Sequence, residues 1–173
     1  MIFGLSIQTF TTLHVIITLI AIATGIVVML GMLGSHRMPV WTAIFLLTTV
    51  LTSVTGFMFP IHGFTPALGG GIISIILLAI ALLALYGRHL AGPWRWIYVV
   101  TAIASLWFNL FVLIVQAFEK VSILNALAPQ VGPPFAEPTN THFAITQGVT
   151  LLVIVIIGAL AVIRFRPAPA LRT

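Results

Sequence analysis

Charged residues are so scarce in this chain that they decide its class. Seven Lys and Arg and two Asp and Glu occur among 173 residues, and they lie between long apolar runs. With 61% hydrophobic residues and a mean hydropathy of +1.25, the composition is typical of a protein whose helices cross a membrane several times. The sequence therefore predicts the architecture far more firmly than it predicts a reaction or a ligand.

Five apolar stretches are long enough to cross roughly 30 Å of hydrocarbon, which takes about 20 helical residues. They are Phe10–Leu33, Val40–Phe59, Leu68–Gly87, Trp96–Phe118 and Phe143–Ile163. The bilayer core offers no water to free backbone groups, so each span must be helical. Their uniform apolarity lacks the alternation of a β-barrel strand. We predict an all-α membrane protein with one domain over residues 1–173.

The basic residues predict the orientation. If there are five spans, six of the seven cations fall on one side: Arg37, Arg88, Arg95, Arg164, Arg166 and Arg172. Only Lys120 falls on the other side. The positive-inside rule then places the N-terminus outside and the C-terminus in the cytoplasm. The net charge of +5 follows from this distribution and forms no basic stripe, so nucleic-acid binding is not expected. The absence of cysteine excludes disulfides and thiolate metal sites.

Polar residues within the spans predict which helices face one another, because such residues usually face protein. Stripes of Thr, Ser, Asn, Gln and small residues run along the first, second, fourth and fifth spans. These four spans are expected to surround a polar interior, with Asn109 near mid-membrane. The third span contains mainly Ile, Leu and Ala beyond Ser74, so it is expected to be peripheral, with the most lipid-exposed surface.

Three histidines are predicted to lie at similar depth near the outer face. His14 lies about one turn inside the first span, His62 follows the second, and His142 begins the fifth. Imidazole is a common metal ligand and the usual axial ligand of membrane haem b, so these three form a candidate metal site. Gln116 and Gln147 lie at matching depth, and we expect them to share a cavity with His14.

The candidate cofactor-binding residues are His14, His142, Gln116, Gln147 and Asn109. The bound group could be haem b, a divalent metal or a quinone, and no catalytic residue is identified. Packing is an alternative role for the amides, because membrane helices often bond to one another through such groups. His36 and His89 lie in polar turns beside arginines, and we expect them to have no chemical role.

Several segments carry a family resemblance. Thr52–Pro60 (TSVTGFMFP), Gly63–Ala67 (GFTPA), Leu90–Val99 (LAGPWRWIYV) and Asn109–Val112 (NLFV) resemble a family of small bacterial membrane proteins that have no assigned activity. The chain resembles more loosely a larger group with a histidine in the first span, here His14, and a His-Arg turn after it, here His36-Arg37. The resemblance implies a multi-pass protein of the bacterial inner membrane and no particular mechanism.

Three function classes remain. The first is a redox-type protein that binds haem, metal or quinone at the outer histidines. The second is a non-catalytic subunit of a larger membrane complex, and the third is a carrier or channel for a small solute. Fold alone cannot decide among them. The expected partners are the lipid bilayer and either further copies of the chain or a larger complex.

Overall fold

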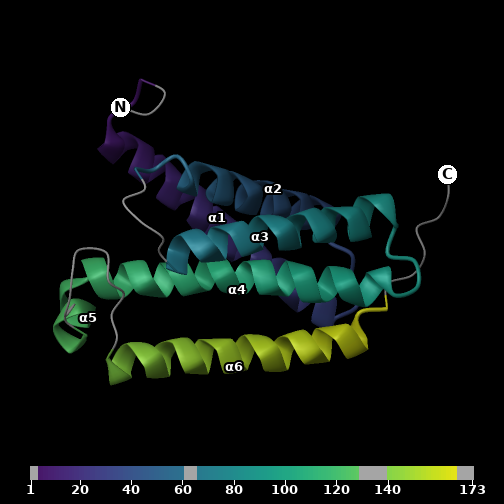
Figure 1. Ribbon diagram of the computed structural model, residues 1–173. Coiled ribbons are helices and arrows are strands. Elements are labelled where there is room, and N and C mark those ends of the chain that lie inside the picture. The colour runs from purple at the N-terminus through teal and green to yellow at the C-terminus, as the bar shows by residue number, and fades with distance from the viewer. Residues whose placement is uncertain (1–3, 61–65, 129–139, 167–173) are drawn as a thin grey trace.

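The structure is a computed structural model that describes residues 4–60, 66–128 and 140–166, and its elements are helices (Figure 1). The long helices are α1 (Ile7–Leu33), α2 (Pro39–Gly56), α3 (Pro66–Leu82), α4 (Trp94–Lys120) and α6 (Thr141–Arg164). Helix α3 continues into one π-helical turn, η1 (Leu83–Gly87), and a short helix, α5 (Ser122–Leu127), follows α4. Neither η1 nor α5 was predicted from the sequence.

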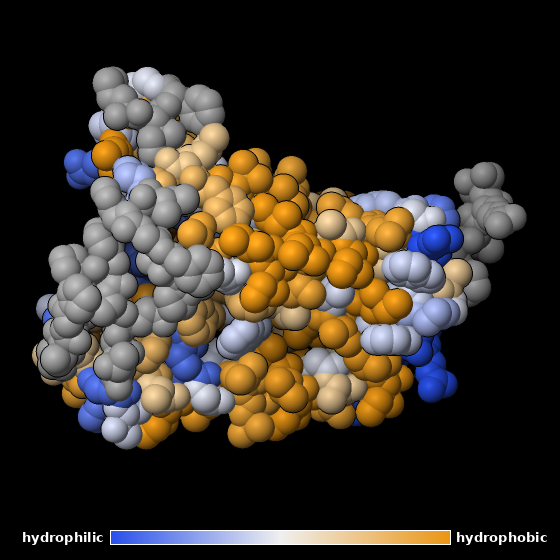
Figure 2. Space-filling view, in the orientation of Figure 1, coloured by the Kyte–Doolittle hydropathy of each residue, from blue (hydrophilic) through white to orange (hydrophobic). Residues whose placement is uncertain are grey.

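Five of these helices are long and apolar enough to cross a membrane, counting α3 and η1 together as 68–87. This finding confirms the predicted number of spans and their approximate bounds. Figure 2 shows an apolar band across the middle of the molecule, with hydrophilic residues gathered toward its two ends. The band fits the hydrocarbon layer, and the ends fit the two head-group regions.

Local chemistry explains where the spans begin. The Ser6 hydroxyl accepts a bond from the Thr9 amide at 3.1 Å, and this cap starts α1. Pro39 is the first residue of α2, where its missing amide proton is not needed. The Asn140 side chain accepts from the Phe143 amide at 3.0 Å and starts α6. The sequence therefore helps to specify where α1, α2 and α6 begin, in addition to packing.

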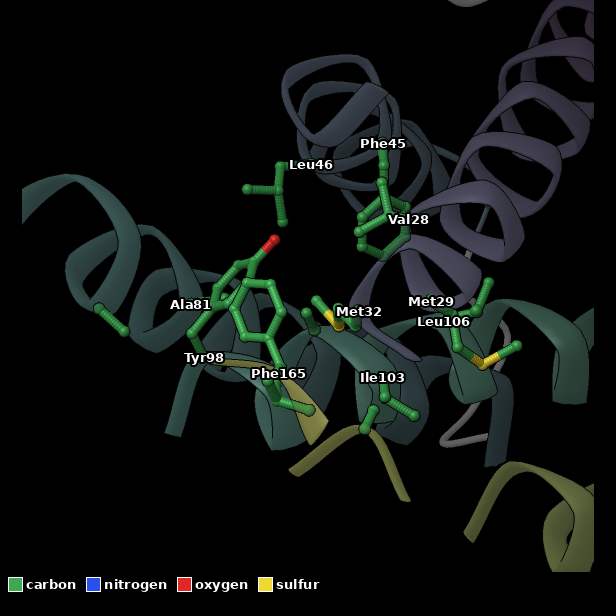
Figure 3. Packing of buried hydrophobic residues seen from close by; sticks show 14 of the residues in the cluster. Val28, Met29, Met32, Phe45, Leu46, Ala81, Tyr98, Ile103, Leu106 and Phe165 are labelled. Carbon is green, nitrogen blue, oxygen red and sulfur yellow. The ribbon is translucent and has the colours of Figure 1, made fainter. Parts of the chain in front are cut away.

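Helix α4 is the centre of the bundle, because it packs against α1, α2, α3 and α6. Its buried core residues include Tyr98, Val99, Ala102 and Leu106, which join side chains from the other spans in one apolar cluster (Figure 3). Helix α1 packs most extensively against α2. Amide and hydroxyl groups on these helices bond across the interfaces, as described below.

The prediction that the third span has the most lipid-exposed surface is wrong. Ser74, Leu78 and Ala81 of α3 are buried against the bundle, with exposed fractions of 2% or less. The least covered span is α6. Within its apolar stretch of 18 residues 11% is buried, whereas 28% is buried in the corresponding stretch of 68–87. The error arose because an Ile, Leu and Ala surface packs as well against protein as against lipid.

Candidate functional site

The predicted outer site was centred on His14, and the structure gives this side chain a partner on the neighbouring helix. Its Nδ1 lies 2.7 Å from the Thr55 hydroxyl of α2, and its ring meets the Phe59 ring edge-on at 5.3 Å. The Thr55 hydroxyl also lies 2.7 Å from the Leu51 carbonyl; when it donates to that carbonyl, His14 Nδ1 is the donor to Thr55. This half-buried imidazole thus joins α1 to α2.

The predicted amides also have partners of their own. Asn109 donates to the Thr49 hydroxyl at 3.3 Å, and this buried bond joins α4 to α2. Gln147 donates to the Phe111 carbonyl at 3.1 Å and joins α6 to α4. Gln116 donates to Glu119 at 3.3 Å within α4. Across the described ranges, no hydrogen bond connects His14 to either glutamine, so the shared cavity stays a prediction.

The remaining members of the predicted metal site are not brought together. His142 is exposed at the start of α6, and His62 lies outside the described residues. Within residues 4–60, 66–128 and 140–166, no group of three or more His, Asp or Glu side chains could hold a metal ion. The three-histidine site therefore gains no support, and the role of His62 stays untested.

The structure instead has a cavity at the opposite end of the bundle, which we call the arginine end because Arg37, Arg88, Arg95, Arg164 and Arg166 lie there. The cavity has a volume of about 240 Å³. Its apolar lining residues are Val28, Met32, Met38, Pro39, Leu85, Leu90 and Phe165. Its polar lining residues are His36, Arg37, Thr42, Tyr86, His89 and Tyr98.

The turn after α1 forms one side of this cavity. A Cβ atom on Gly31 would lie 2.5 Å from the Met38 sulfur, and one on Gly34 would lie 2.7 Å from Nδ1 of His36. Real Cβ atoms do not approach other atoms so closely, so the absence of a Cβ at Gly31 and Gly34 lets the Met38 and His36 side chains lie against the last turn of α1. Ser35 reverses the chain with a φ of 58°. The two glycines therefore place His36 at the cavity.

The turn after η1 forms a second side. His89 and Leu90 both adopt left-handed backbone conformations, with φ of 50° and 60°, which are unusual for residues that carry a Cβ. Bonds from the Arg88 amide to the Leu83 carbonyl (2.8 Å) and from the Leu90 amide to the Ala84 carbonyl (3.0 Å) hold this conformation. Such strain, together with a π-helical turn, is common at functional sites. Here it directs His89 and buried Leu90 to the same cavity.

Tyr98 and Thr42 supply the deep end of the cavity. Tyr98 is 2% exposed, and its hydroxyl interacts with the Thr42 side chain. By contrast His36, Arg37, Tyr86 and His89 are exposed, so the cavity opens at the surface of the bundle. A molecule in it would meet imidazoles at the mouth, a phenol at the base and apolar walls between them.

The arginines at this end differ in their roles. Arg88 lies over the Trp94 ring, with its guanidinium carbon 5.2 Å from the ring centroid. Arg95 donates to the Val162 carbonyl at 3.3 Å and to the Phe165 carbonyl, which ties the end of α6 to α4. Of the described arginines, only Arg37 lines the cavity. The site is thus polar with little charge of its own.

We expected no chemical role for His36 and His89 from the sequence, and the structure places both of them at this cavity. Both lie in turns that the alternation of spans places on the same side of the membrane, so their shared depth was readable from the sequence. The sequence did not show that the two side chains converge, because their convergence depends on the packing of α1, α2 and α4 and on the left-handed turn at His89.

No family model, no curated protein and no solved structure matches the chain. The resemblance to small bacterial membrane proteins therefore stays an expectation.

Proposed function

We propose that this chain is a quinone-binding membrane protein that holds the quinone head group in the cavity at the arginine end. The observation that carries the proposal is the lining: two imidazoles and two phenols, together with Arg37 and Thr42, line one cavity whose other walls are apolar. A quinone head is a flat apolar ring with carbonyl acceptors at its edge. Imidazole and phenol groups can donate to those carbonyls while apolar walls hold the ring faces.

The size of the cavity suits the head group of a quinone, whose isoprenoid tail would stay outside the cavity. Cavities for drug-sized ligands measure roughly 300–1,000 Å³, and this one measures about 240 Å³. A small ring fits such a space, and an attached isoprenoid tail would remain in the lipid. Haem is less well suited, since His36 and His89 both lie in turns rather than on facing spans.

The charge of the cavity lining favours a neutral quinone over an anionic lipid as the occupant. A phosphate group would call for several cationic donors, because charge-assisted bonds supply most of its affinity. Arg88 and Arg95 are engaged with Trp94 and with backbone carbonyls, which leaves Arg37 for the cavity. A neutral head with two acceptors matches this donor set better.

We place the cavity on the cytoplasmic side of a bacterial inner membrane, with the N-terminus outside. The positive-inside rule supports this orientation, because the arginines gather at the end that contains the cavity. The quinone proposal retains the redox class expected from the sequence but moves its site from the outer histidines to His36 and His89. The alternatives, a subunit of a larger complex and a solute carrier or channel, have no comparable geometric support.

Equilibrium binding would test the proposal. The full chain is placed in phosphatidylcholine nanodiscs and titrated with radiolabelled 2-decyl-1,4-benzoquinone, and empty nanodiscs of the same lipid give the background. We expect saturable binding of one molecule per chain above that background. His89→Ala and Tyr98→Phe should each weaken binding about two- to tenfold, the effect of losing one hydrogen bond of 0.5–1.5 kcal/mol.

His142→Ala is the matched control, since it removes an exposed imidazole at the other end of the bundle. It should leave the affinity unchanged. Two results would contradict the proposal: uptake no greater than that of empty nanodiscs, or equal losses in His89→Ala and His142→Ala. Displacement of the probe by added phosphatidylglycerol at constant total lipid would point to an anionic lipid as the occupant.

A further inference from the structure

The end of α6 and the turn after α1 meet at the arginine end of the bundle. The Arg166 amide donates to the Ser35 hydroxyl at 2.8 Å, so two segments far apart in the sequence lie side by side. Arg164 lies two residues before Arg166, and Arg37 lies two residues after Ser35; all three arginines are exposed. One hydrogen bond therefore gathers three exposed arginines at one place, and we call Arg37, Arg164 and Arg166 the arginine cluster.

The side chains of this cluster have donors to spare. Within the described residues neither Arg164 nor Arg166 makes a side-chain hydrogen bond or an ion pair, whereas Arg95 donates to two carbonyls. A guanidinium carries five N–H donors and keeps its positive charge at physiological pH. The one acidic residue that the structure describes, Glu119, lies at the other end of α4. The negative partner of the cluster is therefore best sought outside the chain.

Aromatic residues indicate the depth of the cluster in the membrane. Trp41, Tyr86 and Trp96 lie at the same end of the bundle, and each is about half exposed. Tryptophan and tyrosine gather at the head-group level of membrane proteins, where an apolar ring meets a wet surface. Figure 2 shows hydrophilic residues at this end, beyond the apolar band. The cluster thus lies at the level of the lipid phosphates.

We infer that the arginine cluster binds the phosphate of an anionic phospholipid in the surrounding leaflet. A guanidinium pairs with a phosphate through two parallel charge-assisted hydrogen bonds. The acyl chains of such a lipid would lie along α6, the span with the least buried surface. Arg164 and Arg166 do not line the cavity, so this second site is independent of the quinone proposal.

Two lipids with the same acyl chains give a direct test: dioleoylphosphatidylglycerol, which is anionic, and dioleoylphosphatidylcholine, which is zwitterionic. Native mass spectrometry of the full chain counts the lipids bound and gives the affinity for each. Each arginine near a membrane surface strengthens anionic-lipid binding about fivefold. We therefore expect the wild-type chain to favour phosphatidylglycerol at least about tenfold, and Arg164→Gln/Arg166→Gln to lose most of this preference. A high concentration of ammonium acetate should weaken it by screening.

Lys120→Gln is the matched control for the single variant Arg166→Gln. Each removes one exposed cation, but Lys120 lies at the other end of α4. Because Arg166 bonds to Ser35 through its backbone amide, the glutamine variant can keep that bond. Arg166→Gln should reduce the preference for phosphatidylglycerol about fivefold, and Lys120→Gln should leave it unchanged.

Three results would overturn the inference. The first is equal affinity of the wild-type chain for the two lipids, and the second is an equal loss of preference in Arg166→Gln and Lys120→Gln. The third is displacement of the lipid by an equal concentration of inorganic phosphate, which would assign the cluster to a soluble anion. The double variant should still bind 2-decyl-1,4-benzoquinone as the wild type does, so the quinone proposal and this inference can fail separately.

Discussion

Gly25, in the middle of α1, is the position where the packing of this bundle can be tested most sharply. A Cβ atom placed there would lie 2.7 Å from Cδ1 of Leu106 and 2.8 and 2.9 Å from two ring atoms of Phe45. Leu106 and Phe45 are each 1% exposed. Gly25 therefore lets α1 approach α2 and α4 together, and the alanine variant must displace two nearly buried side chains.

The expected magnitude follows from two opposing terms. Overpacking a well-packed core typically costs about 1–3 kcal/mol, and we take the upper half of this range because both displaced side chains are so fully buried. Replacing glycine by alanine within a helix returns about 1 kcal/mol of helix propensity. Gly25→Ala should therefore lower the free energy of unfolding by about 1–2 kcal/mol, which corresponds to a melting temperature roughly 2–8 °C lower.

Gly148→Ala provides the control on α6. An added Cβ at Gly148 would meet no atom within 4 Å, so only the propensity term applies. Its melting temperature should equal or exceed that of the wild type. The assay is thermal unfolding of each purified protein in the same detergent, followed by circular dichroism. A Gly25→Ala protein as stable as Gly148→Ala would show that α1, α2 and α4 do not meet at this point.

Three further predictions concern hydrogen bonds and topology. Asn109→Ala should lower the free energy of unfolding by roughly 0.6–1.7 kcal/mol, from the average to the maximum found for hydrogen bonds between membrane helices. Thr49→Val should add little more if the two groups act as one pair, and a double-mutant cycle with additive effects would contradict this. His14→Ala should lower the free energy of unfolding by a similar amount, because the bond to Thr55 is lost, and it should not change the affinity for the quinone probe. A variant of unchanged stability that no longer binds the probe would show that His14 belongs to the site. A reporter fused after Thr173 should be active only in the cytoplasm, and activity confined to the periplasm would reverse the orientation.

The sequence was sufficient to predict the spans because the rule behind them is simple. An apolar run of sufficient length in a bilayer has to be helical, and Gly, Pro and Arg in the turns specify where each run ends. The arrangement of the spans was harder to predict. Ser74 looked isolated on an apolar helix, yet α3 buries it against the bundle. Lipid and protein are equally apolar neighbours, so hydrophobicity alone does not indicate which face of such a helix is covered.

The site expected from the sequence and the cavity that we propose lie at opposite ends of the bundle. His14 was singled out because an imidazole inside a bilayer needs a partner, and that reasoning was correct, but the partner is a threonine one helix away. The signal for His36 and His89 was weaker, since histidines in turns are usually solvated. Only the three-dimensional structure shows that glycines at 31 and 34 and the left-handed conformation at His89 bring those two side chains to one cavity.

The energetics of the bilayer suggest why the polar groups divide in this way. Within the membrane an unpaired amide or imidazole is expensive, and Asn109 and His14 each bond to a threonine of the neighbouring helix α2. At the arginine end, the mouth residues His36 and His89 are exposed at head-group depth, where water can satisfy their ring nitrogens until a ligand replaces it. A bundle with so few polar residues can therefore keep free donors only near its ends, and its ligand site is best sought where a cavity and such donors coincide.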